Sequence, residues 1–240
     1  MTRTAIIAAM PGELKPLVRG WQHESHNGVD IWTRKQNAND WVAACAGAGV
    51  AAATRAFAAI EKDGAIDSAV SVGWAGALDD GLLPGRAYRV ARVTDIQTGE
   101  RFERREAQAG CSLLTSPKVA DRAEKRRLAS SYRAGLVDME AAAIARLAES
   151  RGIPFYCIKG VSDGPADNLP DFNRFIDPNG KFRTYAFVIF ALLSPWLWPA
   201  LIQMGENSRK ASQAIAESLL DLLDERGHIR NRNGYTNLQR

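Results

Sequence analysis

Acidic side chains follow two predicted buried strands and open one predicted helix. Residues 155–161 form an apolar run short enough for a strand buried on both faces, and Ser162 and Asp163 follow it directly. Glu13 lies just beyond the predicted strand 4–9, and Glu140 lies at the start of the helix that precedes 155–161. Because open α/β sheets bind ligands at the carboxyl ends of their strands, these carboxylates predict a site for acid–base chemistry.

The segment 136–163 positions two of these carboxylates. Its pattern predicts a short strand, a helix and a second strand. Asp138 can cap the helix at its N-terminus, and Gly152 and Pro154 end it in the usual glycine-then-proline order. Apolar residues at every fourth position give the helix a buried stripe: Met139, Ala143 and Leu147. We therefore expect Glu140 and Asp163 at the same edge of a sheet.

The composition indicates one large α/β domain. The chain has 240 residues, 46% hydrophobic and 24% charged, which suits a sizeable core. We place the domain over residues 1–225 and expect a frayed basic tail over 226–240. The net charge of +4 is concentrated in that tail and in residues 122–133, which we interpret as a solvated face. Neither segment carries interleaved aromatic residues or a nucleic-acid motif, so we expect no nucleic-acid partner.

Cysteine and histidine usage favours a cytoplasmic protein without a metal. Cys45, Cys111 and Cys157 are far apart, and two of them lie in strand-like runs, so we expect reduced thiols. His23 and His26 have no third ligand nearby, and we predict no metal site. The N-terminus enters a strand directly, without the features of a signal peptide.

A glycine turn at 47–53 admits a dinucleotide-binding interpretation. The segment fits G-x-G-x-x-A, and Asp67 follows where a ribose-binding acid would stand, about twenty residues on. However, a predicted hairpin over 29–45 precedes the turn, whereas the dinucleotide motif usually opens its domain. We therefore favour close packing of helix and strand as the reason for these glycines.

The two acidic segments also carry a resemblance to a known family. The motif Val137-Asp138-Met139-Glu140-Ala141, followed some twenty residues later by Val161-Ser162-Asp163, resembles the paired signature of the purine nucleoside phosphorylase and methylthioadenosine/S-adenosylhomocysteine nucleosidase superfamily. The resemblance covers the chain up to about residue 171. It implies a three-layer αβα fold with a central mixed, twisted sheet, and an enzyme that cleaves the N-glycosidic bond of a purine nucleoside.

The resemblance implies a role for each acidic residue. Asp163 would protonate N7 of the base, and an aspartate at this position points to a 6-amino purine, hence adenine. Glu140 would accept the ribose 2′- and 3′-hydroxyls, and Met139 would pack beneath the sugar. Glu13 would orient a water molecule as the nucleophile. Burial of Asp163 would favour its protonated form, as a general acid requires.

Further substrate-binding residues follow from the same resemblance. Ser162 precedes the acid, and Ala75 and Gly76 belong to a loop whose small residues let main-chain N–H groups approach the ribose. Trp74 stands where the family has a small hydroxyl residue, so it is expected to wall the pocket, to stack on the ligand or to point into the core. Val119 would offer an apolar face to the base.

The nucleophile separates two enzyme classes. We favour water and expect no cofactor. A phosphorylase would use phosphate as co-substrate, and that reaction needs an anion site, for which Arg34, Arg55 and Arg86 are candidates. The departure at Trp74 leaves a third alternative, a nucleoside-binding homologue that has lost turnover.

The C-terminal region departs from the superfamily pattern. Residues 185–202 carry no charge, and Pro195 and Pro199 predict two short helices over 182–193 and 196–204 before a final helix at 208–223. The apolar run could be core, a homo-oligomer interface, a membrane-surface contact or, least favoured, a membrane span. The region resembles the bacterial subgroup associated with hopanoid biosynthesis, which implies a lipid-linked adenosine as substrate and a location peripheral to the inner membrane.

Overall fold

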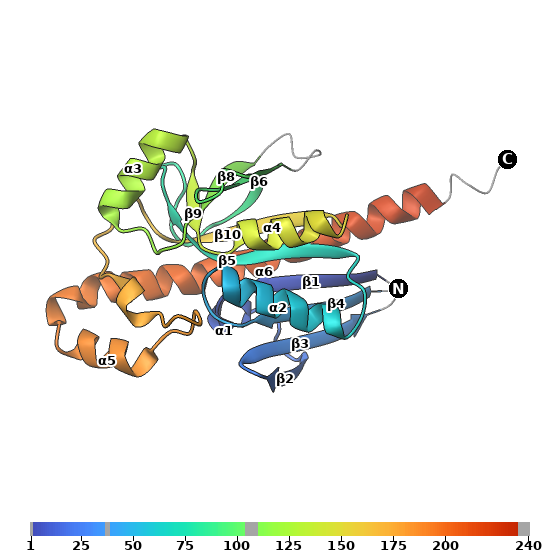
Figure 1. Ribbon diagram of the computed structural model, residues 1–240, viewed down its shortest axis with the longest axis horizontal. Helices are drawn as coiled ribbons and strands as arrows, with labels where there is room; N and C mark the ends of the chain where they lie inside the picture. The colour runs from blue at the N-terminus through green and yellow to red at the C-terminus, as the bar shows by residue number, and fades with distance from the viewer. Residues whose placement is uncertain (1, 37–38, 104–109, 235–240) are drawn as a thin grey trace.

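The computed structural model describes residues 2–36, 39–103 and 110–234 and shows a sheet covered by helices on both faces (Figure 1). The strands are β1 (Thr2–Ala8), β2 (Gln22–His26), β3 (Val29–Gln36), β4 (Asn39–Cys45), β5 (Ser68–Ala77), β6 (Ala87–Asp95), β7 (Arg101–Glu103), β8 (Cys111–Thr115), β9 (Leu136–Asp138) and β10 (Phe155–Asp163). The helices are α1 (Pro11–Leu14), α2 (Val50–Lys62), α3 (Arg122–Tyr132), α4 (Ala141–Ser150), α5 (Thr184–Leu192) and α6 (Trp198–Gly234), with 3₁₀ helices η1 (Phe172–Phe175) and η2 (Pro195–Leu197).

The sheet mixes parallel and antiparallel strands. Its order is β10-β6-β8-β9-β5-β1-β4-β3-β2, and β10 also pairs with β5. β5 is parallel to β1 and β10, whereas β6 is antiparallel to β10 and β9 is antiparallel to β5. The second pairing of β10 closes one part of the sheet into a ring of strands, and the rest extends from β5 as an open sheet. This architecture confirms the predicted α/β fold with a mixed central sheet.

Strand β1 shows how the helices cover both faces. Successive side chains of a strand point to opposite faces of the sheet. Ile7 packs in a core with residues of α2 and α4, whereas Ile6 packs in a second core with residues of α1 and α6. Both side chains are fully buried. The sheet is therefore the middle of three layers, and its strand ends are the places left open for a site.

The predicted unit around 136–163 is present. It consists of β9, α4 and β10, and the strand-end positions of Asp138 and Asp163 agree with the sequence pattern. The helix begins at Ala141, with Glu140 as its N-cap residue, and not directly after Asp138. The Oδ2 atom of Asp138 still accepts the N–H of Ala141 at 2.9 Å, the capping contact that the sequence predicts.

The C-terminal helices differ from the prediction. Helix α5 agrees with the first predicted helix, but residues 198–204 and 208–223 belong to one helix, α6, while residues 196 and 197 belong to η2. Pro199 lies in the first turn of α6, where a missing N–H removes no helical hydrogen bond. The tail predicted to fray from residue 226 is helical as far as Gly234, and residues 235–240 lie outside the described part of the chain.

The apolar segment 185–202 lies on the surface, at one end of the molecule (Figure 1). No residue of α5 is buried, and Tyr185, Leu193 and Trp196 are 89%, 73% and 72% exposed. The interpretation of this segment as core is therefore wrong, while contact with a second subunit or with a membrane surface stays a prediction. None of the described helices alone is long and apolar enough to cross a membrane; α5 taken with residues 195–223 meets the length and composition criteria, but this pair is bent by 101° at its break.

Candidate active site

A cavity of about 470 Å³ lies beyond the carboxyl ends of β1, β5 and β10. Glu13, Glu140 and Asp163 all line it. The cavity wall also contains the remaining residues that the sequence predicted for the site: Met139, Ser162, Ala75, Gly76, Trp74 and Val119. The parallel strands β1, β5 and β10 end at the same edge of the sheet, and this shared edge brings residues distant in the sequence together.

Main-chain N–H groups fix the carboxylate of Glu13, which is 4% exposed. Its Oε2 atom accepts hydrogen bonds from the N–H groups of Ala9 (2.8 Å) and Met10 (2.7 Å), and its Oε1 atom accepts one from Trp74 (2.7 Å). Burial raises the pKa of Glu13 above its ordinary value, by more than these hydrogen bonds and the charge of Lys159 lower it. A fixed carboxylate with a raised pKa suits a general base near neutral pH.

The glycine turn before α2 binds the second carboxylate. The N–H of Gly49 donates a hydrogen bond to the Oε1 atom of Glu140 at 2.7 Å, and Gly49 has a φ of 89°, a conformation that favours glycine. Asp67 lies at the opposite end of the strands, where its Oδ2 atom accepts the N–H of Arg3 at 2.7 Å. The dinucleotide-binding interpretation is therefore wrong, because its phosphate turn and its ribose acid do not face one site.

A buried ion pair lies behind Glu140, and the sequence reasoning missed it. The ammonium group of Lys159 lies 2.9 Å from the Oδ2 atom of Asp138, and the two side chains are 1% and 0% exposed. Burial, followed by the negative charge of Asp138, raises the pKa of Glu140, while Lys159 lowers it. Lys159 interrupts an apolar strand, and this interruption is the signal that could have predicted a buried partner.

The end of the cavity at Asp163 contains a second lysine that the sequence reasoning missed. Lys125, on α3, donates hydrogen bonds to the Oδ2 atom of Asp163 and to the main-chain oxygen of Gly164 (2.7 Å). Its side chain is 3% exposed. The hydroxyl of Ser162 lies 2.5 Å from the other carboxylate oxygen, Oδ1. The interpretation of 122–133 as a wholly solvated face is therefore wrong at Lys125.

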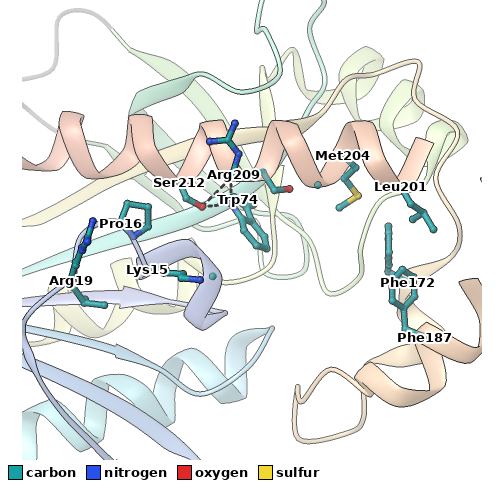
Figure 2. A pocket seen from close by; sticks show the side chains of 14 residues that line it. Lys15, Pro16, Arg19, Trp74, Phe172, Phe187, Leu201, Met204, Arg209 and Ser212 are labelled. Atoms are coloured by element: carbon teal, nitrogen blue, oxygen red, sulfur yellow. Dashed lines mark hydrogen bonds between the residues drawn. The ribbon is translucent and has the colours of Figure 1, made fainter. Parts of the chain in front are cut away.

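Trp74 lines both this cavity and a second one of about 920 Å³, whose lining residues Figure 2 shows. Its indole N–H lies within hydrogen-bond distance of the main-chain oxygen of Ser208 (3.1 Å) and the hydroxyl of Ser212 (2.9 Å), both on α6. The two cavities share walls at Gly12, Trp74, Phe172 and Met204. Trp74 lines the wall of both cavities and also packs against a core cluster that includes Val72, Ile158 and Ile215, whereas stacking on a ligand stays a prediction.

The main chain of Val119 is already bonded on both sides. The side-chain amide of Asn173 accepts the N–H of Val119 at 2.8 Å and donates to its carbonyl oxygen at 3.0 Å. Asn173 belongs to η1, in the segment that follows β10 and covers the cavity. A ligand that used the main chain of Val119 would first have to displace this amide.

The arginines considered for a phosphate site lie elsewhere. Arg34, Arg55 and Arg86 do not line the cavity. Arg34 lies over the ring of Trp41, 5.8 Å from its centroid, and Arg55 donates to the main-chain oxygens of Ala46 and Asn179. The described side chains therefore do not gather these three arginines into an anion site.

Comparison with known protein families now adds to this geometry. A family model described as the phosphorylase superfamily matches residues 3–123 and 97–188, which together span most of the chain. The chain belongs to the phosphorylase superfamily. This match confirms the resemblance drawn from residues 137–141 and 161–163. No curated protein matches the chain.

Solved structures share the fold of this superfamily member over nearly its whole length. A 5′-methylthioadenosine/S-adenosylhomocysteine nucleosidase of Helicobacter pylori has a TM-score of 0.69 at 15% identity, with 93% of this chain and 98% of that chain covered. The futalosine hydrolase of Helicobacter pylori gives the same four values. A nucleosidase of Colwellia psychrerythraea 34H, solved in complex with adenine, has a TM-score of 0.67 at 19% identity, with 93% and 95% covered.

The raised pKa of Glu140 predicts a gain in stability when its charge is removed. A carboxyl group with a raised pKa in the folded state contributes stability below its ordinary pKa, and this contribution is lost as the pH rises through the folded-state pKa. We expect Glu140→Gln to unfold at a higher temperature than the wild type at about pH 8, by about 2–4 °C for each kcal/mol of difference in the free energy of unfolding. At about pH 5 the two proteins should differ little.

Thermal unfolding of both proteins at the two pH values measures this effect. Glu61→Gln is the matched control. The hydrogen bond from Arg151 lowers the pKa of Glu61, so removal of this charge should lower the unfolding temperature at both pH values. A difference between Glu140→Gln and wild type that does not change with pH would contradict the argument.

Proposed function

We propose that this chain hydrolyses the N-glycosidic bond of an adenosine-type nucleoside and releases adenine. The observation that carries the proposal is the convergence of Glu13, Glu140 and Asp163 on one cavity. Membership of the phosphorylase superfamily supports chemistry at a nucleoside. The structural neighbour from Colwellia psychrerythraea, a nucleosidase of the same fold, was solved in complex with adenine.

Glu13 is the proposed base for the attacking water. Three main-chain hydrogen bonds hold its carboxylate, and its raised pKa allows it to accept a proton near neutral pH. Water is favoured over phosphate because the candidate arginines 34, 55 and 86 lie outside the cavity wall, and Arg122, the arginine that lines it, is exposed. The indole of Trp74 is a donor to α6 and supplies no hydroxyl for a phosphate.

Glu140 and Met139 form the proposed ribose site. The Oε1 atom of Glu140 accepts the N–H of Gly49, and the carboxylate keeps lone pairs for the 2′- and 3′-hydroxyls. As the C1′–N9 bond breaks, positive charge develops on the ribose. This charge favours the ionised form of Glu140, whose pKa burial raises in the free protein, and the ionised carboxylate then stabilises the charge. The base leaves as a neutral molecule only if its N7 atom receives a proton at the end of the cavity where Asp163 lies.

The second cavity is the proposed site for the 5′ substituent. It adjoins the first through Gly12, Trp74, Phe172 and Met204. The apolar side chains of Phe187 and Leu201 line it next to Phe172 and Met204, and Lys15, Arg19 and Arg209 line the rest of it (Figure 2). A long apolar 5′ chain could extend from the ribose into this space toward the exposed segment 185–202. This arrangement supports a lipid-linked adenosine as the substrate, in keeping with the predicted contact of that segment with a membrane.

Turnover of four nucleosides, with and without phosphate, tests the proposal. Adenosine, methylthioadenosine and an adenosine with a long 5′-alkylthio chain should release adenine and free ribose at rates independent of phosphate. Inosine should be slower, and kcat/KM should rise with the length of the 5′ chain. Formation of ribose 1-phosphate would instead identify a phosphorylase. A lack of base release from every nucleoside, combined with nucleoside binding, would identify the non-catalytic alternative.

A further inference from the structure

Lys125 differs from the rest of the basic helix that carries it. Its neighbours Arg126 and Arg127 are exposed, whereas the side chain of Lys125 is 3% exposed and lines the nucleoside cavity. Burial of a charged amine costs several kcal/mol, and this cost is about as large as the attraction within a good ion pair. A buried amine therefore needs partners that compensate for the loss of water. The chain provides these partners in Asp163 and Gly164.

The surrounding main chain leaves room for this lysine. A Cβ atom on Gly76 would lie 2.9 Å from Cε and 3.3 Å from Nζ of Lys125. A side chain at position 76 would therefore force the ammonium group away from Asp163. Gly76 lies in β5 and Lys125 in α3, so the position of the lysine depends on two elements of the cavity wall and not on α3 alone.

The ion pair changes what Asp163 can do. Asp163 is the acceptor in this pair and Lys125 the donor, because the ammonium group donates to the Oδ2 atom of Asp163 and has no acceptor of its own. The hydrogen bonds of Lys125 to Asp163 and Gly164 use two of its three N–H groups. The base end of the cavity therefore offers a proton donor on Lys125 beside an acceptor on Asp163.

The imidazole edge of adenine has the complementary arrangement, because the N7 acceptor lies beside the donor 6-amino group. We propose that Lys125 donates the proton to N7 of the leaving base, with Asp163 as its counter-ion and as the acceptor of the 6-amino group. This proposal rests on the proposed function and replaces Asp163 as the acid.

The step balances in atoms and electrons. The C1′–N9 bond breaks and its electron pair stays on the base, while one proton passes from the Lys125 ammonium group to N7, so that neutral adenine leaves. Water adds to C1′ and loses one proton to Glu13. Lys125 then regains a proton and Glu13 releases one through solvent, which restores both groups for the next turnover.

Substrates with different leaving groups test the proposal. Adenosine needs a proton on its base, whereas 4-nitrophenyl β-D-ribofuranoside has a leaving group that departs as an anion. We expect Lys125→Met to lower kcat/KM for adenosine by about 10²–10⁴-fold, and for the nitrophenyl riboside by less than about tenfold. Lys125→Arg should recover part of the lost activity on adenosine, because it retains a cation and N–H donors at this position.

The exposed neighbour supplies the control. Arg126→Met removes one charge from the same helix and should leave both activities unchanged. If Lys125→Met does not fold, as judged by circular dichroism, Lys125→Gln gives the same comparison with a neutral side chain. Equal losses on both substrates would assign Lys125 a structural role and overturn the proposal. Retained activity on adenosine, or a loss confined to inosine, would overturn it as well.

The wild-type measurement separates the two proposals. If wild type releases adenine but Lys125→Met does so equally well, only the role of Lys125 fails. If wild type releases no base from any nucleoside, the proposed function fails, and the role of Lys125 fails with it.

Discussion

Glu13→Gln is expected to lower kcat for adenine release by about 10²–10⁴-fold, with a much smaller change in KM. The amide cannot accept a proton from water. It also places an NH₂ group against main-chain donors, either Trp74 or the pair Ala9 and Met10. Steady-state release of adenine, followed by chromatography, measures the effect.

Stability and pH separate this loss from a folding defect. Burial raises the pKa of Glu13, so removal of its charge offsets part of the cost of the main-chain N–H groups that the amide leaves unpaired, and we expect the variant to stay folded at the assay temperature. In the wild type the base must be ionised, so activity should fall as the pH drops through a value above 4.5, the ordinary pKa of a glutamate. If kcat of Glu13→Gln stays within about tenfold of wild type, Glu13 is not the base.

Lys159→Met is expected to lower the free energy of unfolding by about 3–5 kcal/mol. The change leaves the carboxylate of Asp138 without its cation in a place with 0% exposure. Thr115 and Ala141 still donate hydrogen bonds to Asp138, but neither neutralises its charge. Urea unfolding of wild type and variant measures the difference.

Two further variants identify the cause. Lys62→Met removes an exposed lysine from α2 and should change stability by less than about 0.5 kcal/mol. Asp138→Asn combined with Lys159→Met removes both charges of the pair, so the double variant should be more stable than Lys159→Met alone. A double variant no more stable than the single one would show that packing of the lysine stem, not the unpaired charge, carries the loss.

The sequence was sufficient to predict the site carboxylates because strand ends are readable from local patterns. The apolar run before Asp163 and the turn before Glu13 each mark the end of a buried strand, and parallel strands share one edge. Placing Glu140 required only the start of α4. These predictions depend on residues close in sequence, and the structure confirms that all three carboxylates line one cavity.

The two lysines could not be placed in the same way. Lys159 interrupts an apolar strand, which indicates a buried partner but does not identify Asp138. Lys125 stands among basic residues of α3, where nothing local distinguishes it from its exposed neighbours. Its burial depends on Gly76 and Asp163, which are distant in the sequence. The joining of residues 198–204 and 208–223 into the single helix α6 was likewise not predicted, although neither Pro195 nor Pro199 lies between these two segments.

Helix α6 has a mechanical consequence for the protein. This one continuous helix contains Ile202, which is 63% exposed, and also Ser208 and Ser212, which lie within hydrogen-bond distance of the indole N–H of Trp74. Ala211 packs closely on Gly160 of β10: a Cβ atom added to Gly160 would lie 2.8 Å from Cβ of Ala211. This close contact leaves α6 little freedom to slide along the sheet. A surface that docks on the exposed N-terminal end of α6 is therefore connected to Trp74, which lines both cavities, through one helix and no flexible linker.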